Sequence, residues 1–498
     1  MEKILEFLSK SSFKIVIILV IIYFVLFSIA SCMRHITFHS SNDLSVFDQK
    51  MWNTLNGRFY LTIEGGETHY QHMDYFILLL LPIYALFPSP LTLVVTQVFF
   101  VSLGCIGIFL LTKEILKKNL NIHTTNLIAL AIAISYLLYP ALQHSILIDY
   151  HSVVLAIPLI IFGFYFLEKN SKWSILLFSL SMFCNESVTF LIVLTSLYIL
   201  IFRKNKNIGL PLLIISLTWF IVGLNILFPS DYVCGQTYFE SYGQRYNHLG
   251  NSSFEVIKNI VKDPIYAFSY GNITQKKNYI IHLFAPHGFV SFLSPETLVL
   301  CSTSFFINIF GKNEWQYSIF GQHYAAILVP FIFISVVYAL ERIRKFFGKK
   351  ILYIIVVIVL ISSIISFFSF GLSPIKVAEI YKNDYENNKE YHNSLKEILN
   401  MIPNNTTVFA QYHLTSHLTK KGFIYRYREQ FRNINGSFVF GSNTISENNV
   451  YPKYGIIDLN KPIYPLEDDD YLLLFDMLKK HNYTLKYNID DIYLFERK

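Results

Sequence analysis

The sequence predicts a mainly α, polytopic membrane protein of about eleven transmembrane helices, followed by a small extracytoplasmic α/β domain. Of the 498 residues, 53% are hydrophobic and only 15% are charged, whereas a soluble protein carries about 25% charged residues. The apolar residues form charge-free blocks such as 15–32, 91–112 and 351–370, each long enough to cross a hydrocarbon core of about 30 Å. Short basic clusters separate the blocks, as is typical of cytoplasmic loops.

The first block, residues 15–32, is predicted to be an uncleaved helix with its N-terminus in the cytoplasm. Lys3, Lys10 and Lys14 precede it, and basic flanks favour the cytoplasmic side. The block is longer than the apolar core of a secretory signal peptide, and no small-x-small cleavage site follows it.

Residues 75–87 are predicted to form a short helix at the outer interface rather than a crossing. Prolines bound this segment. A single crossing at 91–112 then brings the three lysines that follow it to the cytoplasm. The segment therefore belongs to a long outer loop, residues 34–90.

The remaining crossings follow from the same charge rule. They are expected at residues 126–140, 153–167, 174–184, 187–202, 210–228, 280–293, 298–310, 325–340 and 351–370. A second long outer loop covers residues 229–279. Because every basic cluster between helices then lies inside, we expect a transmembrane domain over residues 1–375.

The composition changes after Pro374, and residues 376–498 are predicted to form the soluble domain. Strands are expected at 407–411, 423–427 and 454–459, a helix at 466–480, and a hairpin from 484–487 and 492–495. No catalytic signature occurs there, so a capping or recognition role is the simplest expectation.

The net charge and the cysteines exclude other classes of protein. The formal charge of +7 comes from basic residues in short loops, which indicates membrane topology rather than nucleic-acid binding. The five cysteines show no CxxC spacing, and four of them lie in apolar segments. Neither a disulfide framework nor a zinc site is supported.

The first outer loop holds two candidate catalytic carboxylates, Asp43 and Asp48. Residues 48–55 fit a helix, which would present Asp48 beside an apolar face at the membrane edge. A carboxylate in that place suits general-base work, because it can accept a proton from an attacking hydroxyl. The alternative is structural, with both aspartates capping helices or pairing with Arg34 and Arg58.

The same loop contains a weak candidate for a divalent-cation site. Its hard and borderline ligands are Glu64, Glu67, His69 and Asp74. Their spacing matches no defined metal site. His72 is an alternative contact for a phosphate or for the loop backbone.

Further histidines and carboxylates gather on the predicted outer side. They are His144, Asp149, His151, Glu186, His282, His287, His323 and Tyr324 with its neighbour Gln322. The cytoplasmic loops carry mainly Lys and Arg. Since ionisable groups at membrane depth are costly and tend to be functional, this asymmetry indicates an outward-facing site.

Several motifs resemble a known membrane family, domain of unknown function 2079, which belongs to the broad class of GT-C type glycosyltransferases. The most specific is DLSVFDQ-x-x-WNT, residues 43–54. The others are Gly57-Arg58-Phe59, Glu64-Gly65-Gly66, Asp149-Tyr150-His151, the Asn185-Glu186 turn, Ala285-Pro286 and His323-Tyr324. The likeness extends over almost the whole chain.

The resemblance implies a GT-C-like fold and transfer of a sugar from a polyprenyl-phosphate donor at the outer face. An acidic residue of the first outer loop acts as base in such enzymes, and Asp43 and Asp48 are the matching positions. The Lys-Glu pair expected at the short hairpin is Asn185-Glu186 here, so this chain lacks that lysine.

The implied reaction is an inverting displacement on an extracytoplasmic glycan, lipid or protein acceptor. Arg58, Arg245 and His72 are the candidates for stabilising the leaving phosphate. Asp149, His151, Glu186, His323 and Tyr324 complete the predicted substrate contacts. A transporter or flippase for a lipid-linked or small polar solute is the first alternative, and a sensor or scaffold for a surface ligand is the second.

Overall fold

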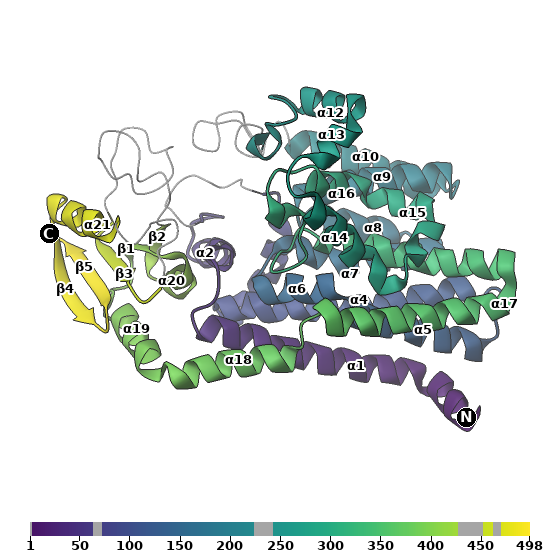
Figure 1. The fold of residues 1–498 in the computed structure, drawn as a ribbon, viewed down its shortest axis with the longest axis horizontal. Helices are drawn as coiled ribbons and strands as arrows, with labels where there is room; N and C mark the ends of the chain where they lie inside the picture. The colour runs from purple at the N-terminus through teal and green to yellow at the C-terminus, as the bar shows by residue number, and fades with distance from the viewer. Residues whose placement is uncertain (1, 63–71, 224–242, 427–451, 462–469) are drawn as a thin grey trace.

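The computed structural model is mainly helical and ends in a five-stranded sheet (Figure 1). It describes residues 2–62, 72–223, 243–426, 452–461 and 470–498. A bundle of helices occupies one side of the molecule, and the sheet lies at the other end, beyond the C-terminal ends of α1 and α18.

The first helices form the centre of the bundle. Helix α1 (Glu2–Ile36) packs against α4 (Pro90–Leu116) and α5 (Ile122–Leu137), and α4 also packs against α7 (Ala156–Glu168). The bundle also contains α6 (Pro140–Ile148), α8 (Trp173–Met182), α9 (Glu186–Ile201) and α10 (Lys206–Val222). Apart from α6, which was not predicted, these positions agree with the apolar blocks of the first seven predicted crossings; residues 224–228 of the seventh block lie outside the described residues.

Helix α17 (Val329–Phe370) covers the last two predicted crossings. Gly348, with φ of 80° and ψ of −179°, breaks the helix, and the two halves run back beside each other (Figure 1). A residue with a Cβ would be strained at this φ. The glycine therefore permits the tight reversal next to the basic cluster that was predicted to lie inside.

Eleven crossings are not confirmed. Among the described residues, three helices are long and apolar enough to span a membrane, or four if the bent pair α5 and α6 forms one span. Helices α7 to α10 are apolar but shorter, with 10–17 residues each when η2 (Ser152–Leu155) is joined to α7. The fold therefore supports a membrane protein without establishing the number of spans.

The clearest departure from prediction lies between residues 280 and 310. In place of two straight crossings, the chain forms short pieces: α14 (Ile273–Phe284), η5 (Ala285–His287), η6 (Val290–Leu293), α15 (Pro295–Leu298), η7 (Val299–Cys301) and α16 (Ser302–Ile309). Gly288 and Phe289 both have positive φ, 56° and 61°. Two successive left-handed residues end the helical hydrogen-bond pattern.

Large apolar side chains are exposed along several helices of the bundle. On α10, Leu210, Ile214 and Ile221 are each at least half exposed, and the second half of α17 exposes a similar row. A soluble monomer rarely presents so much contiguous apolar surface. Lipid chains are the environment that this surface fits.

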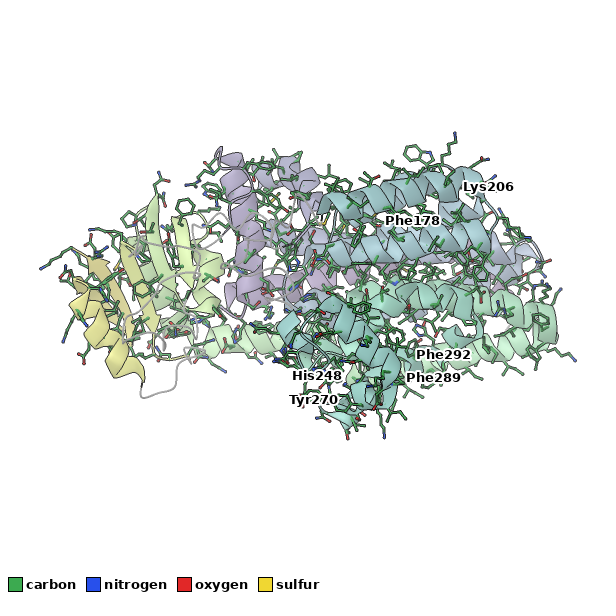
Figure 2. All side chains as sticks on the ribbon, turned by 90° about the horizontal axis from the view of Figure 1, so that it is seen from above. Phe178, Lys206, His248, Tyr270, Phe289 and Phe292 are labelled. Carbon is green, nitrogen blue, oxygen red and sulfur yellow. The ribbon has the colours of Figure 1, made fainter. Side chains whose placement is uncertain are left out.

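Residues 243–279, the described part of the predicted second outer loop, contain short helices on the flank of the bundle. They are η4 (Gln244–Tyr246), α12 (Ser253–Lys262) and α13 (Pro264–Ser269). Figure 2 places the stacked rings of His248 and Tyr270 on this flank and Lys206, at the start of α10, on the opposite one. Phe289 and Phe292 lie on the same flank as His248.

The segment of the chain between α1 and α4 contains short helices. They are α2 (Asn42–Leu55), η1 (Tyr75–Leu80) and α3 (Leu81–Leu86). The length of η1 and α3 agrees with the prediction that residues 75–87 do not form a full crossing. Ser41 caps α2 and Ser89 caps α4, which satisfies backbone N–H groups at both starts.

The sheet has the strand order β2-β1-β3-β5-β4. Its strands are β1 (Thr406–Ala410), β2 (Gly422–Arg426), β3 (Tyr454–Asp458), β4 (Tyr483–Ile489) and β5 (Ile492–Arg497). Strands β1, β2 and β3 are parallel, and β4 and β5 form the predicted hairpin. All five predicted strands are present.

The described part of the C-terminal segment also contains four helices. They are α18 (Pro374–Asn387), α19 (Lys389–Met401), α20 (Tyr412–Leu418) and α21 (Asp470–Lys480). Helix α18 packs along α1, and α20 packs against α2. The C-terminal segment, residues 376–498, is therefore in contact with α2, in the predicted first outer loop. The predicted helix 466–480 begins within residues that lie outside the described part of the chain.

Candidate active site

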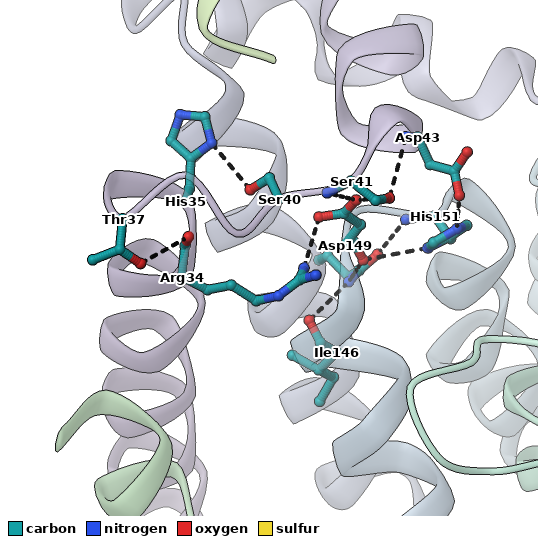
Figure 3. A network of polar contacts seen from close by, with 10 residues as sticks. Arg34, His35, Thr37, Ser40, Ser41, Asp43, Ile146, Asp149 and His151 are labelled. Carbon is teal, nitrogen blue, oxygen red and sulfur yellow. Dashed lines mark hydrogen bonds and ion pairs between the residues drawn. The ribbon is translucent and has the colours of Figure 1, made fainter. Parts of the chain in front are cut away.

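Asp43 lies in the first turn of α2, where its side chain is 53% exposed. Its Oδ2 is 3.1 Å from Nε2 of His151 (Figure 3). Its backbone N–H donates to the hydroxyl of Ser41, which caps the helix. Asp43 is thus a solvent-reachable carboxylate whose orientation is set by an imidazole.

Asp149 fixes the start of α2 to the bundle. Its carboxylate accepts hydrogen bonds from Arg34 Nη1 at 2.9 Å, from the backbone N–H of Ser41 at 2.7 Å and from the Ser41 hydroxyl (Figure 3). Burial raises the pKa of Asp149 to about 6, although Arg34 and Ser41 act in the opposite direction. The residue therefore connects the C-terminal end of α1 to the helix that carries Asp43.

Gln97 of α4 holds the loop that bears His151. Its amide Nε2 donates to the carbonyl of Asp149 at 2.9 Å, and its Oε1 accepts from the backbone N–H of His151 at 2.7 Å. Gln97 is fully buried. The Gln97 amide satisfies both the carbonyl of Asp149 and the backbone N–H of His151, and it therefore supports the imidazole rigidly.

A row of rings leads away from Asp43. The centroids of His151 and His323 are 3.6 Å apart, those of His323 and Tyr324 are 4.4 Å apart, and those of Tyr324 and Trp315 are 5.1 Å apart. Burial lowers the pKa of His323 well below its ordinary value, which favours the neutral imidazole.

Arg245 stands at the far end of the row. Its guanidinium lies 4.8 Å from the ring centroid of Trp315 and its carbonyl accepts from the backbone N–H of Lys312 at 2.9 Å. Burial raises the pKa of Tyr324, whereas the charge of Arg245 lowers it. A cation and a carboxylate, Asp43, therefore lie at the two ends of one row of rings.

His72 and Glu186 form a second pair near this row. Nδ1 of His72 is 2.8 Å from Oε1 of Glu186, and the backbone N–H of Met73 donates to Oε2 at 3.2 Å. Burial lowers the pKa of His72, but Glu186 outweighs it and the net shift is upward. Glu186 thus holds the residues that lead into η1, and the charge of His72 also acts on His323.

Lys50 was not singled out from the sequence. Its ammonium donates to both carboxylate oxygens of Asp74, at 3.0 and 2.7 Å, and Asp74 also accepts from the hydroxyl of Tyr60. Lys50 and Asp74 are each 1% exposed. Lys50 follows Asp43 by seven positions, so both residues lie on one face of α2. This spacing is the feature of the sequence from which Lys50 could have been identified.

The metal candidates receive no support from the described residues. No group of three or more His, Cys, Asp or Glu side chains is arranged to hold an ion in the described part of the chain. Asp74 is paired with Lys50. Glu64, Glu67 and His69 lie outside the described residues.

Two other predicted site residues lie apart from Asp43. Asp48 has no exposed surface and accepts hydrogen bonds from Tyr84 and Thr419. The guanidinium of Arg58 lies 5.2 Å from the ring centroid of Phe423 in β2. Both residues therefore contact the C-terminal segment. By contrast, Asp43, Asp149, His151, His323, Tyr324, Arg245, His72 and Glu186 are brought together from separate loops.

A family model described as "Predicted membrane protein (DUF2079)" matches residues 34–492. The chain belongs to this family. The resemblance inferred from the first-loop motif is thereby confirmed. No curated protein matches the chain.

The fold is similar to that of ArnT from Cupriavidus metallidurans. The ArnT crystal structure bound to undecaprenyl phosphate has a TM-score of 0.51 and 9% sequence identity, covering 96% of this chain and 97% of that one. The structure in the apo state has a TM-score of 0.52 and 10% identity, with 97% and 98% coverage. At this identity the likeness concerns the fold, and it extends over almost the whole length of both chains.

Proposed function

We propose that the chain is an integral-membrane GT-C type glycosyltransferase that moves a sugar from a polyprenyl-phosphate donor to an extracytoplasmic acceptor. Its N-terminus would lie in the cytoplasm and residues 376–498 outside the cell membrane. The observation that carries the proposal is the half-exposed Asp43 carboxylate, held by His151 at one end of a row of rings that ends at Arg245. The likeness to ArnT, which was crystallised with undecaprenyl phosphate, supports the lipid-linked donor.

We assign the base to Asp43 rather than to Asp48. A general base must come within hydrogen-bond distance of the hydroxyl that it deprotonates. Asp43 is 53% exposed, whereas Asp48 is fully buried and both of its oxygens accept hydrogen bonds. Asp43 alone of the two can meet an acceptor without rearrangement of α2.

The reaction would be a single inverting displacement. The acceptor hydroxyl gives its proton to the Asp43 carboxylate and its oxygen forms a bond to C1 of the sugar. The bond between C1 and the phosphate oxygen breaks, and the electron pair leaves with the polyprenyl phosphate. His151 keeps the carboxylate oriented by its hydrogen bond to Oδ2.

The leaving phosphate needs cationic or hydrogen-bonding groups at a fixed distance from the base. Tyr324 follows His323 along the row of rings, Arg245 lies against the last ring, Trp315, and His72 lies beside the row with a raised pKa. Charge-assisted hydrogen bonds from such groups stabilise a phosphate as negative charge develops on it. Asp149 and Glu186 would act as positioning residues, because each is already bound to a neighbouring cation or imidazole.

The direct test is Asp43→Asn in membranes supplied with a panel of radiolabelled polyprenyl-phosphate sugars. We expect the loss of the base to lower transfer by about 100-fold or more. Asp476→Asn, which changes an exposed aspartate of α21, is the matched control and should transfer as the parent does. Transfer by Asp43→Asn at the parental rate would refute the assignment. Movement of a solute across vesicles without any sugar transfer would favour a transporter.

A further inference from the structure

Helix α2 has a buried face that lies about 140° around the helix from Asp43, since Asp48 follows Asp43 by five positions. Asp48 and Gln49 on this face are both completely buried. Two adjacent polar side chains without exposed surface require hydrogen-bond partners. Those partners come mostly from the far end of the sequence.

The C-terminal segment supplies three of the contacts. The Thr419 hydroxyl, at the end of α20, donates to Oδ2 of Asp48. The amide Nε2 of Gln49 donates to the carbonyl of Gly422, at the start of β2, and at 3.5 Å to that of Thr419. The remaining oxygen of Asp48, Oδ1, accepts from the Tyr84 hydroxyl of α3 at 2.6 Å.

Apolar and cation–π contacts surround this polar centre. Val46 of α2 belongs to the same buried cluster as Leu395, Leu414 and Leu418 of the C-terminal segment. Lys420 lies 5.8 Å from the ring centroid of Trp52. Thus α2 is part of the hydrophobic core of the C-terminal segment as well as the carrier of Asp43.

The orientation of α2 is fixed by opposing contacts. Thr419 holds Asp48 from one side and Tyr84 holds it from the other. A buried carboxylate that loses one donor keeps most of its desolvation cost without compensation. Movement of α2 relative to α20 is therefore costly, and rotation of α2 would also displace Asp43 from His151.

We propose that Asp48 is a positioning residue and that the C-terminal segment, by binding Asp48 and Gln49, holds α2 in the orientation that sets Asp43. The catalytic consequence rests on the proposed function. The docking of α20 on α2 does not rest on it. The C-terminal segment would then be a part of the active-site support rather than only a cap or a recognition module.

Thr419→Val removes the hydroxyl with little change in shape and tests the docking in the purified full chain. Hydrogen exchange of the backbone amides of α2 is the measurement. We expect exchange to accelerate on the order of tenfold or more, because Asp48 loses one of its two donors. Thr419→Ser, which keeps the hydroxyl, should restore slow exchange.

Thr415→Val is the matched control. Thr415 is also fully buried and lies one turn earlier in α20, but its hydroxyl donates to the carbonyl of Tyr412 in its own helix, at 2.8 Å. Exchange of α2 in this variant should match the parent. Slow exchange of α2 in Thr419→Val, or equally fast exchange in Thr415→Val, would overturn the docking.

Sugar transfer provides the second readout. Thr419→Val should lower kcat with little change in the KM for the donor, because the base is displaced while the donor contacts remain. Faster exchange with an undiminished kcat would overturn the positioning role. If α2 exchanges faster and the parent itself transfers no sugar, the docking stands and the proposed glycosyltransferase function fails.

Discussion

Replacement of Asp48 by asparagine should tighten the docking of the C-terminal segment on α2 at neutral pH. Burial raises the pKa of Asp48 from 3.8 to about 6, although the hydrogen bonds from Thr419 and Tyr84 lower it. A carboxyl group with a raised pKa stabilises the docked state fully below pH 3.8, and this stabilisation is lost as the pH rises through about 6. An asparagine side chain at this position keeps an acceptor oxygen and carries no charge.

The size of the effect follows from the two pKa values. The ionised Asp48 disfavours docking by about 3 kcal/mol at pH 7.5, by about half as much at pH 5 and by less than about 1 kcal/mol at pH 4. Asp48→Asn should therefore exceed the parent in docking stability at pH 7.5, and the difference should shrink steadily on acidification. If Asp48 had to be charged to hold the fold, Asp48→Asn would instead dock less stably than the parent at pH 7.5.

Other groups at this junction titrate in the opposite direction. Burial lowers the pKa of His39, His392 and His417, so they stabilise docking above pH 6.5 and that stabilisation is lost as the pH falls. Lys420 also acts on Asp48. All four groups are present in both proteins, so only the difference between Asp48→Asn and the parent isolates Asp48.

The assay is the protection of the α2 amides against hydrogen exchange between pH 4 and 7.5, expressed as protection factors so that the intrinsic pH dependence cancels. Asp476→Asn, at an exposed position, controls for the removal of a negative charge. A difference between Asp48→Asn and the parent that does not change with pH would refute the reasoning, as would weaker docking of the variant at pH 7.5.

Two further predictions concern the other charged and aromatic groups. Lys50→Met leaves Asp74 buried without its cation and should destabilise the protein by about 3–5 kcal/mol, measured by thermal unfolding in detergent. Adding Asp74→Leu should recover most of the lost stability. If the double variant recovers none of it, the loss is due to packing rather than to the unpaired charge. Trp315→Ala removes the ring beneath Arg245 and should lower kcat/KM for a lipid-linked sugar by about 2- to 30-fold; an unchanged value would exclude Trp315 from the donor site.

The local parts of the fold were predictable from the sequence. The strands of the C-terminal sheet begin and end within about two residues of the predicted limits, because their alternation and turns are encoded locally. The segment 280–310 was not predictable in this way. Its apolar composition matches a crossing, whereas the left-handed Gly288 and Phe289 interrupt it, and composition does not encode that backbone reversal.

The sequence predicted most residues of the candidate site, but it did not predict which of their side chains contact one another. Asp43, His151 and His323 were expected on one side of the membrane because the charge rule put their loops there. That rule does not say which of them touch. Trp315 and Lys50 were missed, since a tryptophan in a loop and a lysine in a polar helix are ordinary surface residues until their neighbours are known.

The separate roles of Asp43 and Asp48 show what the sequence motif combines. Both aspartates lie in one twelve-residue string, and both matched the position of a catalytic carboxylate. Their environments separate them: Asp43 is half exposed beside His151, whereas Asp48 is buried and bound to Thr419, 371 residues away. Under the proposed function, a motif that extends over both faces of one helix encodes two requirements, the chemistry at one face and the docking of the C-terminal segment at the other. On this reasoning, Asp43 should tolerate no neutral substitute, whereas position 48 should accept a neutral acceptor of the same shape.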